Sequence, residues 1–259
     1  MENKTQQNKE KAEDKQKEVS NDLVFSYKTI RNFIGFSGMM LPIILALYTI
    51  KEEGDKLIEP SISDYYYTSN GDIFVVVLCV ISVLLFAYNG YNWKEKIWIT
   101  LAAVCGIGVA FSPTDAKYVR HSLSIHSADA KGPEVFGFQL HFVFAILFFI
   151  SLSVMALYYF PKSNKVLARK PGEKWSQKEK RNLVYRICGW TMVSSIVILA
   201  LYFFIPALQI WAGSFPVIFT FETIAVEAFA VSWLTKGETF WPDGEHYLVE
   251  TFEEIKKSL

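Results

Sequence analysis

The side chains of this sequence that could do chemistry are a small set of carboxylates, imidazoles and one phenol. They lie in the segment SISDYYYTSNGD at residues 61–72, in the polar stretch 114–137 and inside long apolar runs. Such groups can bind a metal ion or a polar lipid headgroup, or they can relay protons. The candidates for lining a ligand or ion cavity are Asp64, Tyr66, Asp72, His126, His141, Glu222 and Glu227.

Two glutamates, Glu222 and Glu227, fall inside an apolar run at about residues 214–235. A charged residue at the centre of a membrane helix costs at least ~2.5–3.5 kcal/mol on insertion scales, so ionisable groups there usually face a protein interior or a cavity. The two glutamates are five positions apart, which is about 140° around an α-helix, so they do not both face one ligand. We expect Glu222 to face a cavity that opens outward, whereas a helix-packing role fits Glu227 equally well.

A metal ion is one possible occupant of such a cavity. Zinc held by Asp64, Asp72, His126 and His141 would make the protein a metal-dependent lipid hydrolase. Catalytic zinc sites typically draw two histidines from nearby positions on one helix, and neither HxxxH nor HExxH occurs. We therefore expect no cofactor and keep zinc as an alternative. Serine hydrolase chemistry has less support, because GxSxG is absent and the serines of 61–72 are distant in sequence from any histidine.

The elements that must position these side chains are six long apolar runs in a chain that is 51% hydrophobic. A helix needs about 20 residues to cross the hydrocarbon core, and lipid cannot hydrogen-bond to a bare backbone, so each run should be helical. The sequence therefore predicts an all-α fold, a polytopic bundle of six transmembrane helices within residues 28–238. The predicted spans are about 32–50, 73–91, 97–113, 138–160, 187–210 and 214–235.

Small residues and prolines within these runs are interpreted as packing features. Gly106 and Gly108, with Ala102 and Ala103, give the third run a smooth face for close helix packing. Pro206 is interpreted as a kink within the fifth membrane helix.

The orientation follows from the distribution of Lys and Arg, which concentrate on the cytoplasmic side of membrane proteins. Residues 161–186 carry nine of them, whereas residues 51–72 carry two lysines and six acids. Both termini are therefore expected in the cytoplasm, as a charged tail at 1–27 and a second tail at 239–259 that has the spacing of an amphipathic helix. Residues 61–72 are expected outside, with their three tyrosines at headgroup depth.

Several motifs resemble those of known membrane proteins. The strings SDYYYT and SWLTKGE, within a match over roughly residues 30–238, resemble a family of uncharacterised bacterial six-helix integral membrane proteins. More distantly, LPIILALY and EPSISDY are similar to Frag/DRAM/Sfk-type membrane proteins, which are linked with lipid remodelling and lipid asymmetry. The resemblance implies a six-helix bundle in the bacterial cytoplasmic membrane, with membrane lipids as partners.

Three functions are compatible with these observations. The leading hypothesis is a non-enzymatic protein whose outward-facing polar cavity binds a lipid headgroup or a small ligand, in a transport or sensing role. In that case we expect Asp72, His141 and Glu222 to meet around the cavity. The alternatives are the metal-dependent lipid hydrolase and a proton- or ion-coupled carrier that uses Glu222 and Glu227. A net charge of zero gives no indication of nucleic acid, and an oligomer is compatible with the sequence.

Overall fold

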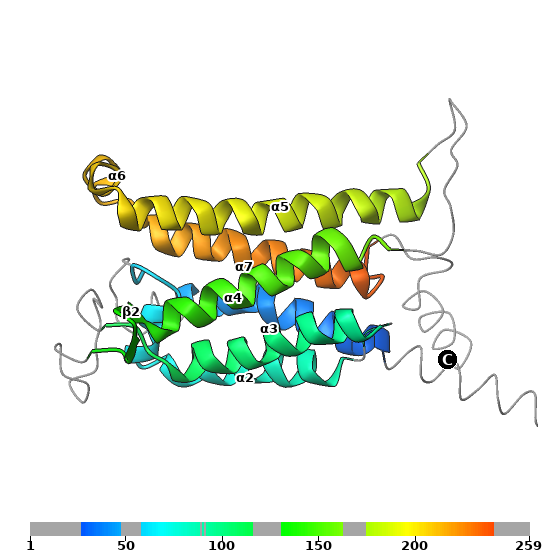
Figure 1. Ribbon diagram of the computed structural model, residues 1–259, viewed down its shortest axis with the longest axis horizontal. Helices are drawn as coiled ribbons and strands as arrows, with labels where there is room; N and C mark the ends of the chain where they lie inside the picture. Colours follow the sequence, from blue (N-terminus) through cyan, green and yellow to red (C-terminus); the bar gives the residue numbers. More distant parts are fainter. Residues whose placement is uncertain are drawn as a thin grey trace, which may run out of the picture.

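The computed structural model describes residues 27–47, 58–88, 90, 92–115, 131–162 and 175–240. These residues form an all-α fold in which one small hairpin is the described β structure (Figure 1). The predicted all-α class is confirmed. The elements in chain order are the first helix (Tyr27–Leu47), the 3₁₀ helix η1 (Ser63–Tyr67), α2 (Gly71–Ala87), α3 (Trp93–Phe111), the strands β1 (Glu134–Val135) and β2 (Phe138–Gln139), α4 (Leu140–Val154), the π-helical turn η3 (Met155–Tyr159), α5 (Gln177–Phe204), α6 (Pro206–Ala212) and α7 (Val217–Lys236).

Among the described residues, four helices are long and apolar enough to cross a membrane: the first helix, α4 continued through η3, α5 and α7. The helix α2 is apolar but has 17 residues. The helix α3 has 19 residues and begins with the charged residues Lys94, Glu95 and Lys96. Large apolar side chains such as Val83 and Phe204 are exposed on the outside of the bundle, and extensive apolar surface marks a membrane or protein contact. The chain therefore has the helices and the surface of a membrane protein.

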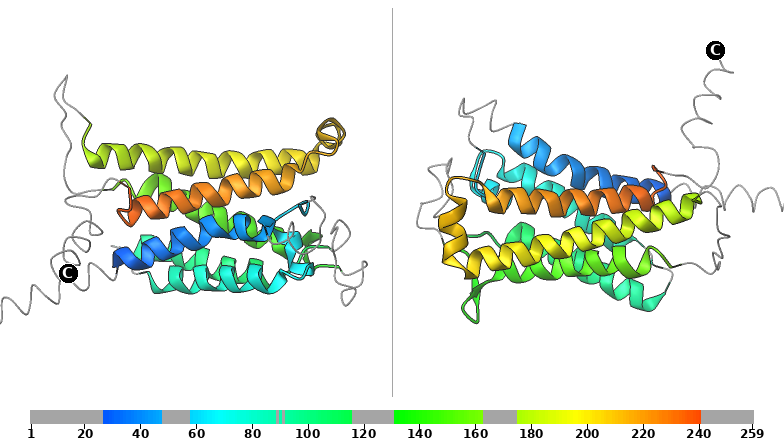
Figure 2. Two further views of the ribbon diagram at one scale, coloured as in Figure 1. Left: turned by 180° about the vertical axis from the view of Figure 1, so that it is seen from behind. Right: turned by 90° about the horizontal axis from the view of Figure 1, so that it is seen from above.

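The long helices lie side by side and alternate in direction along the long axis of the molecule (Figures 1 and 2). The most extensive packing joins α5 with α7, and α3 with both α2 and α4. One end of the bundle, which we call the cavity end, carries η1, the hairpin and α6. At the other end, called the opposite end, the first helix begins beside the end of α7, where Lys28 Nζ pairs with Glu238 Oε2 at 2.9 Å.

A glycine brings the first helix against α7. A Cβ atom at Gly35 would lie 2.8 Å from the backbone oxygen of Ala230 and 2.9 Å from the backbone nitrogen of Leu234. Both obstacles are main-chain atoms, so the two helices can approach this closely only because residue 35 has no side chain.

Small residues play the same role on α3. A Cβ atom at Gly106 would meet Ser82 Oγ on α2, and one at Gly108 would meet a phenylalanine ring on α4. Ala102 and Ala103 are buried in the same core. The predicted small-residue face of the third run is therefore confirmed as the surface on which α2 and α4 pack.

The fifth helix differs from its predicted bounds at both ends. It begins at Gln177, where a capping box closes its first turn, rather than near residue 187. It ends at Phe204 because the backbone of Ile205 is extended, with φ −116° and ψ 96°, the conformation favoured before a proline. Pro206 then begins the separate helix α6, which runs across the cavity end (Figure 2). The interpretation of Pro206 as a kink within a membrane helix is therefore wrong.

The hairpin β1–β2 leads into α4. Its two turn residues, Phe136 and Gly137, have positive φ values of 52° and 78°, as expected for the primed turns that join two-residue hairpins. Glu134 pairs with Gln139 across the hairpin. This pairing fixes Gln139 directly before the first turn of α4, at the cavity end.

Buried charged side chains close the opposite end. Tyr88 Oη donates to Glu95 Oε1 (3.3 Å), and Arg31 Nη2 donates to Tyr88 Oη (3.4 Å). The Arg31 guanidinium also lies over the Tyr88 ring, 5.3 Å from its centroid, in cation–π geometry. Lys236 Nζ donates to the carbonyl of Phe160 at 3.5 Å. Cations from the first helix and α7 thus gather at this end.

Candidate functional site

The helix η1 covers the cavity end and is anchored there by its tyrosines. Tyr65 is buried, with its ring centroid 6.3 Å from that of Phe219 on α7. Tyr67 is also buried, and its Oη donates to the Thr114 carbonyl at 2.6 Å. Tyr66 is half-buried and packs edge-on against Tyr67. Tyr65 and Tyr67 therefore tie η1 to the bundle, and the depth of the three tyrosines relative to the lipid headgroups stays a prediction.

Glu222 joins η1 to α7. The Ile62 N–H, at the start of η1, donates to Glu222 Oε2 at 2.6 Å. One turn earlier on α7, the Phe219 N–H donates to the carbonyl of Pro60 at 2.8 Å. The first amides of a helix have no partner within it, so a carboxylate at this position satisfies one of them and favours the positive end of the η1 dipole.

Asp64 is buried within η1, with 6% of its surface exposed. Its backbone N–H donates to Ser61 Oγ at 3.0 Å, and Thr114 Oγ1 donates to its Oδ1 at 3.3 Å. Burial, with a smaller contribution from the charge of the buried Glu59, raises the pKa of Asp64 to about 6 against the lowering effect of the Ser61 and Thr114 hydrogen bonds. Asp64 is therefore a carboxyl group that exchanges its proton close to neutral pH.

Asp64 and Glu222 line one cavity of about 600 Å³. Its wall is built by η1 and the residues before it, the segment after α3, the hairpin, α4, α5, α6 and α7. The acidic side chains on this wall are Asp64, Asp115 and Glu222, and the aromatic ones are Phe142, Tyr202 and Phe203. Neither lysine, arginine nor histidine is found among the described residues that line it.

Two further contacts shape the cavity wall. Asp115 Oδ1 accepts a hydrogen bond from the Gly132 N–H at 2.9 Å, which fixes the chain after α3. The side-chain oxygen of Gln139 is enclosed and has no hydrogen-bond partner among the described residues. Volumes of about 300–1,000 Å³, with mostly apolar walls and a few convergent polar groups, are typical of small-molecule sites. The arrangement can hold a polar group of a ligand without a metal.

His141 lies beside this cavity, 2% exposed, rather than on its wall. Its Nδ1 is 2.7 Å from the Ser112 carbonyl and its Nε2 is 2.8 Å from Ser63 Oγ. A carbonyl oxygen only accepts, so Nδ1 carries the hydrogen, and neutral His141 accepts the Ser63 O–H at Nε2. This is the orientation in which a histidine can act as a general base towards a serine.

The sequence analysis missed Ser63 as a partner of His141. The two residues are 78 positions apart, and neither lies in a recognised nucleophile motif. A signal was nevertheless present, because Ser63 sits beside Asp64 in the polar segment and His141 is the polar residue in the first turn of an apolar helix.

The remaining candidates do not converge on the cavity. Asp72 is exposed in the first turn of α2, so the expected meeting of Asp72, His141 and Glu222 does not occur. Glu227 is half-buried on α7 and does not line the cavity. His126 lies outside the described residues. Within the described part of the chain, no group of three His, Cys, Asp or Glu side chains is placed to hold a metal ion.

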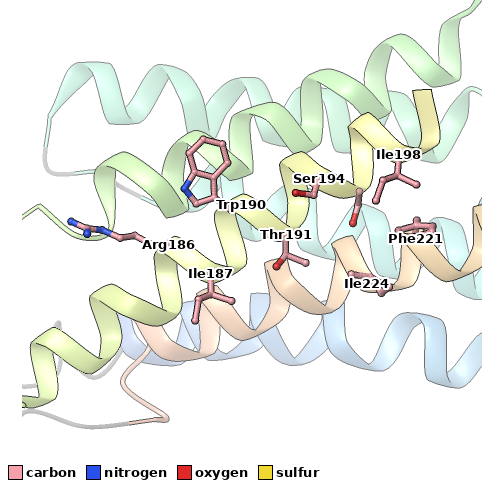
Figure 3. Close-up of a pocket in the computed structure, with 9 residues that line it drawn as sticks. Arg186, Ile187, Trp190, Thr191, Ser194, Ile198, Phe221 and Ile224 are labelled. Atoms are coloured by element: carbon pink, nitrogen blue, oxygen red, sulfur yellow. The ribbon is translucent and has the colours of Figure 1, made fainter. Parts of the chain in front are cut away.

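A second cavity, of about 450 Å³, lies between α5 and α7 (Figure 3). Its wall is mainly apolar, with Trp190, Ile198 and Phe221 among its residues. Thr191 and Ser194 on α5 also face it, and none of the predicted site residues does. Its character is that of a surface groove between two helices, and the acidic cavity is therefore the candidate functional site.

Comparison with known proteins adds no relative: no protein-family model, curated protein or solved structure matches this chain. The resemblance to bacterial six-helix membrane proteins stays a prediction.

Proposed function

We propose that this protein crosses the bacterial cytoplasmic membrane six times, with both termini in the cytoplasm and the acidic cavity open to the outside. In this arrangement the spans are the first helix, α2, α3, α4 with η3, α5 and α7. Their alternating directions support it. So does the charge distribution, because Arg31, Lys162, Arg181 and Lys236 lie at the opposite end, and positive residues favour the cytoplasmic side.

The function that the geometry supports best is binding of a lipid headgroup or a small polar ligand in this cavity, in a transport or sensing role. The observation that carries the proposal is the convergence of Asp64, from η1, and Glu222, from the first third of the apolar helix α7, on one cavity of about 600 Å³. Carboxyl groups at such positions are costly to keep in an apolar bundle, and a bound polar ligand offsets that cost.

Ligand-induced stabilisation of the purified protein tests this function. A panel of headgroup analogues and small polar molecules is added in detergent, and thermal unfolding is followed by circular dichroism. A ligand at 100 times its Kd should stabilise the protein by about 2.7 kcal/mol. The Asp64→Asn/Glu222→Gln double variant should lose this response. A panel in which no compound stabilises the wild-type protein contradicts the proposal.

A lipid hydrolase is the second candidate, because Ser63 and His141 have the geometry of a serine activated by a histidine. Reaction with a fluorophosphonate probe tests it. Mass spectrometry should find the probe on Ser63, and His141→Asn should abolish the labelling. Wild-type protein that stays unlabelled under conditions that label a known serine hydrolase excludes this candidate.

A further inference from the structure

We propose that the acidic cavity selects a ligand that carries an ammonium group, either a primary amine or a quaternary amine. This inference rests on the proposed function and names the chemistry of the ligand. Three features of the wall carry it: the sign of its charge, its aromatic side chains and an enclosed oxygen without a partner.

The acidic groups on the wall can carry charge of one sign only. Asp64, Asp115 and Glu222 line the cavity, and none of the described lining residues is basic. The buried Glu59 adds a further carboxyl group behind Asp64. A cavity lined by one sign of charge, with low-dielectric walls, concentrates counter-ions, so an anionic ligand is disfavoured and a cation is favoured.

The aromatic side chains distinguish an organic cation from an inorganic one. The rings of Phe142 on α4 and Phe203 on α5 pack with centroids 5.3 Å apart, and both line the cavity with Tyr202. Aromatic faces attract ammonium groups, and quaternary ammonium ligands are typically recognised by aromatic cages. A hard metal ion instead requires a cage of six to eight oxygens, and the described residues provide no cluster of three ligands.

An unpartnered oxygen completes the set. The Gln139 Oε1 atom is enclosed at the cavity wall and accepts no hydrogen bond from the described residues. An enclosed acceptor without a donor destabilises the protein, and the N–H or polarised C–H groups of an ammonium ligand can satisfy it. Asp64, Glu222 and Gln139 come from three different elements, so they can contact the ligand from several sides.

The ammonium group can belong to a free amine or to a lipid headgroup, and the experiment separates these sources. Isothermal titration calorimetry of the purified protein uses choline, ethanolamine and 3,3-dimethylbutanol, the neutral carbon isostere of choline, with glycerol phosphate as the anionic probe. At least one ammonium probe should bind about tenfold or more tightly than the neutral isostere.

In parallel, native mass spectrometry compares retention of phosphatidylethanolamine, phosphatidylcholine and phosphatidylglycerol. Preferred retention of the first two indicates the lipid source, and binding of the free probes without such retention indicates a free amine.

Matched variants locate the binding. Glu222→Gln and Asp64→Asn should each weaken ammonium binding about tenfold, since each removes a charge-assisted contact. Glu222→Gln keeps an oxygen that can accept the Ile62 N–H, so it should fold. Phe142→Leu tests the aromatic wall independently and should weaken the quaternary probe more than the primary one. Glu227→Gln, on the same helix but away from the cavity, should bind as the wild-type protein does.

The outcomes separate this inference from the proposed function. Tighter binding of the neutral isostere or of glycerol phosphate overturns the ammonium assignment and leaves a ligand-binding cavity in place. Equal effects of Glu222→Gln and Glu227→Gln place the binding elsewhere and also overturn it. If no probe binds and no lipid is retained, both this inference and the proposed function fail.

Discussion

At the residue scale, His141 is the side chain that connects α3 to η1 at the cavity end. Its two ring nitrogens join Ser112 at the end of α3 to Ser63 in η1, in a buried environment. Such a bridge fixes η1 over the cavity whether or not Ser63 is a nucleophile. Substitutions of His141 and of Ser63 can therefore separate the contribution of this bridge to folding from its contribution to any chemistry.

Replacing His141 should destabilise the protein more than replacing Ser63. His141→Ala leaves two buried polar groups without partners, the Ser112 carbonyl and the Ser63 hydroxyl, whereas Ser63→Ala leaves one, His141 Nε2; each such group costs about 1–3 kcal/mol. Unfolding in an SDS titration, followed by helical circular dichroism, measures both. Ser69→Ala, at an exposed position of the same segment, is the control. If His141→Ala unfolds like this control, the bridge does not hold η1.

The buried carboxyl of Asp64 should make stability depend on pH. Burial raises its pKa from 3.8 to about 6, helped by the charge of Glu59 and opposed by hydrogen bonds from Ser61 and Thr114. A raised pKa means that folding favours the protonated form. The stabilisation is complete below the unfolded value of 3.8 and is lost as pH rises through about 6.

The comparison with Asp64→Asn isolates this effect, because asparagine does not titrate. A shift of about two units corresponds to about 3 kcal/mol. The free energy of unfolding of the wild-type protein should therefore fall relative to that of the variant, by up to this amount, between about pH 4 and about pH 7. Parallel SDS titrations across this range measure the difference. A difference that stays constant with pH means that Asp64 is not the titrating group.

Sequence reasoning identified Asp64 and Glu222 for a physical reason, and missed other residues for equally physical ones. A glutamate within an apolar run has a high cost, so its cavity could be expected from composition alone. Asp72 was wrongly predicted to line the cavity. An acid in the first turn of a helix is stabilised by the helix dipole, so its presence there does not indicate a ligand. Ser63 was missed because its pairing with His141 depends on how η1 packs against α4: the local sequence marks each residue as polar but does not pair them.

At the scale of elements, the contact between the first helix and α7 depends on Gly35. A Cβ atom there would lie within 3 Å of two main-chain atoms of α7, so Gly35→Ala should push the helices apart and cost about 1–3 kcal/mol. SDS unfolding measures this loss, with Phe36→Leu, an exposed position one residue away, as the control. Unchanged stability of Gly35→Ala would show that the first helix can shift without loss of packing.

The type of each long helix could be predicted from hydropathy, but the ends could not. The helix α5 begins at Gln177, ten residues before the predicted start, and its first turns contain charged residues. A capping box, rather than the edge of the apolar run, sets where it begins. The helix α6 and the β-hairpin arise from the local geometry of Pro206 and Gly137. A long apolar window averages over such single residues, yet these two elements carry part of the cavity wall.

At the scale of the whole molecule, the two ends of the bundle carry opposite charge. Acids line the cavity end. At the opposite end, the Arg31 Nη1 group donates to the backbone carbonyl of Lys236 at 3.5 Å, and the buried Arg181 lies close to Lys236. Arg31 and Lys236 at this end add to the Lys and Arg excess of residues 161–186. The same asymmetry that favours a cationic ligand at the cavity end thus favours a cytoplasmic location for the opposite end.

Cysteine labelling in intact bacterial cells tests this orientation. After Cys79, Cys105 and Cys188 are replaced by alanine, Ser69→Cys at the cavity end and Gln177→Cys at the opposite end place thiols at exposed positions. A membrane-impermeant maleimide should label Ser69→Cys in intact cells, and Gln177→Cys only after the cells are permeabilised. The reverse pattern would place the acidic cavity in the cytoplasm, so that its ligand would have to come from inside the cell. Labelling of both positions in intact cells would mean that the bundle does not separate the two ends across a membrane.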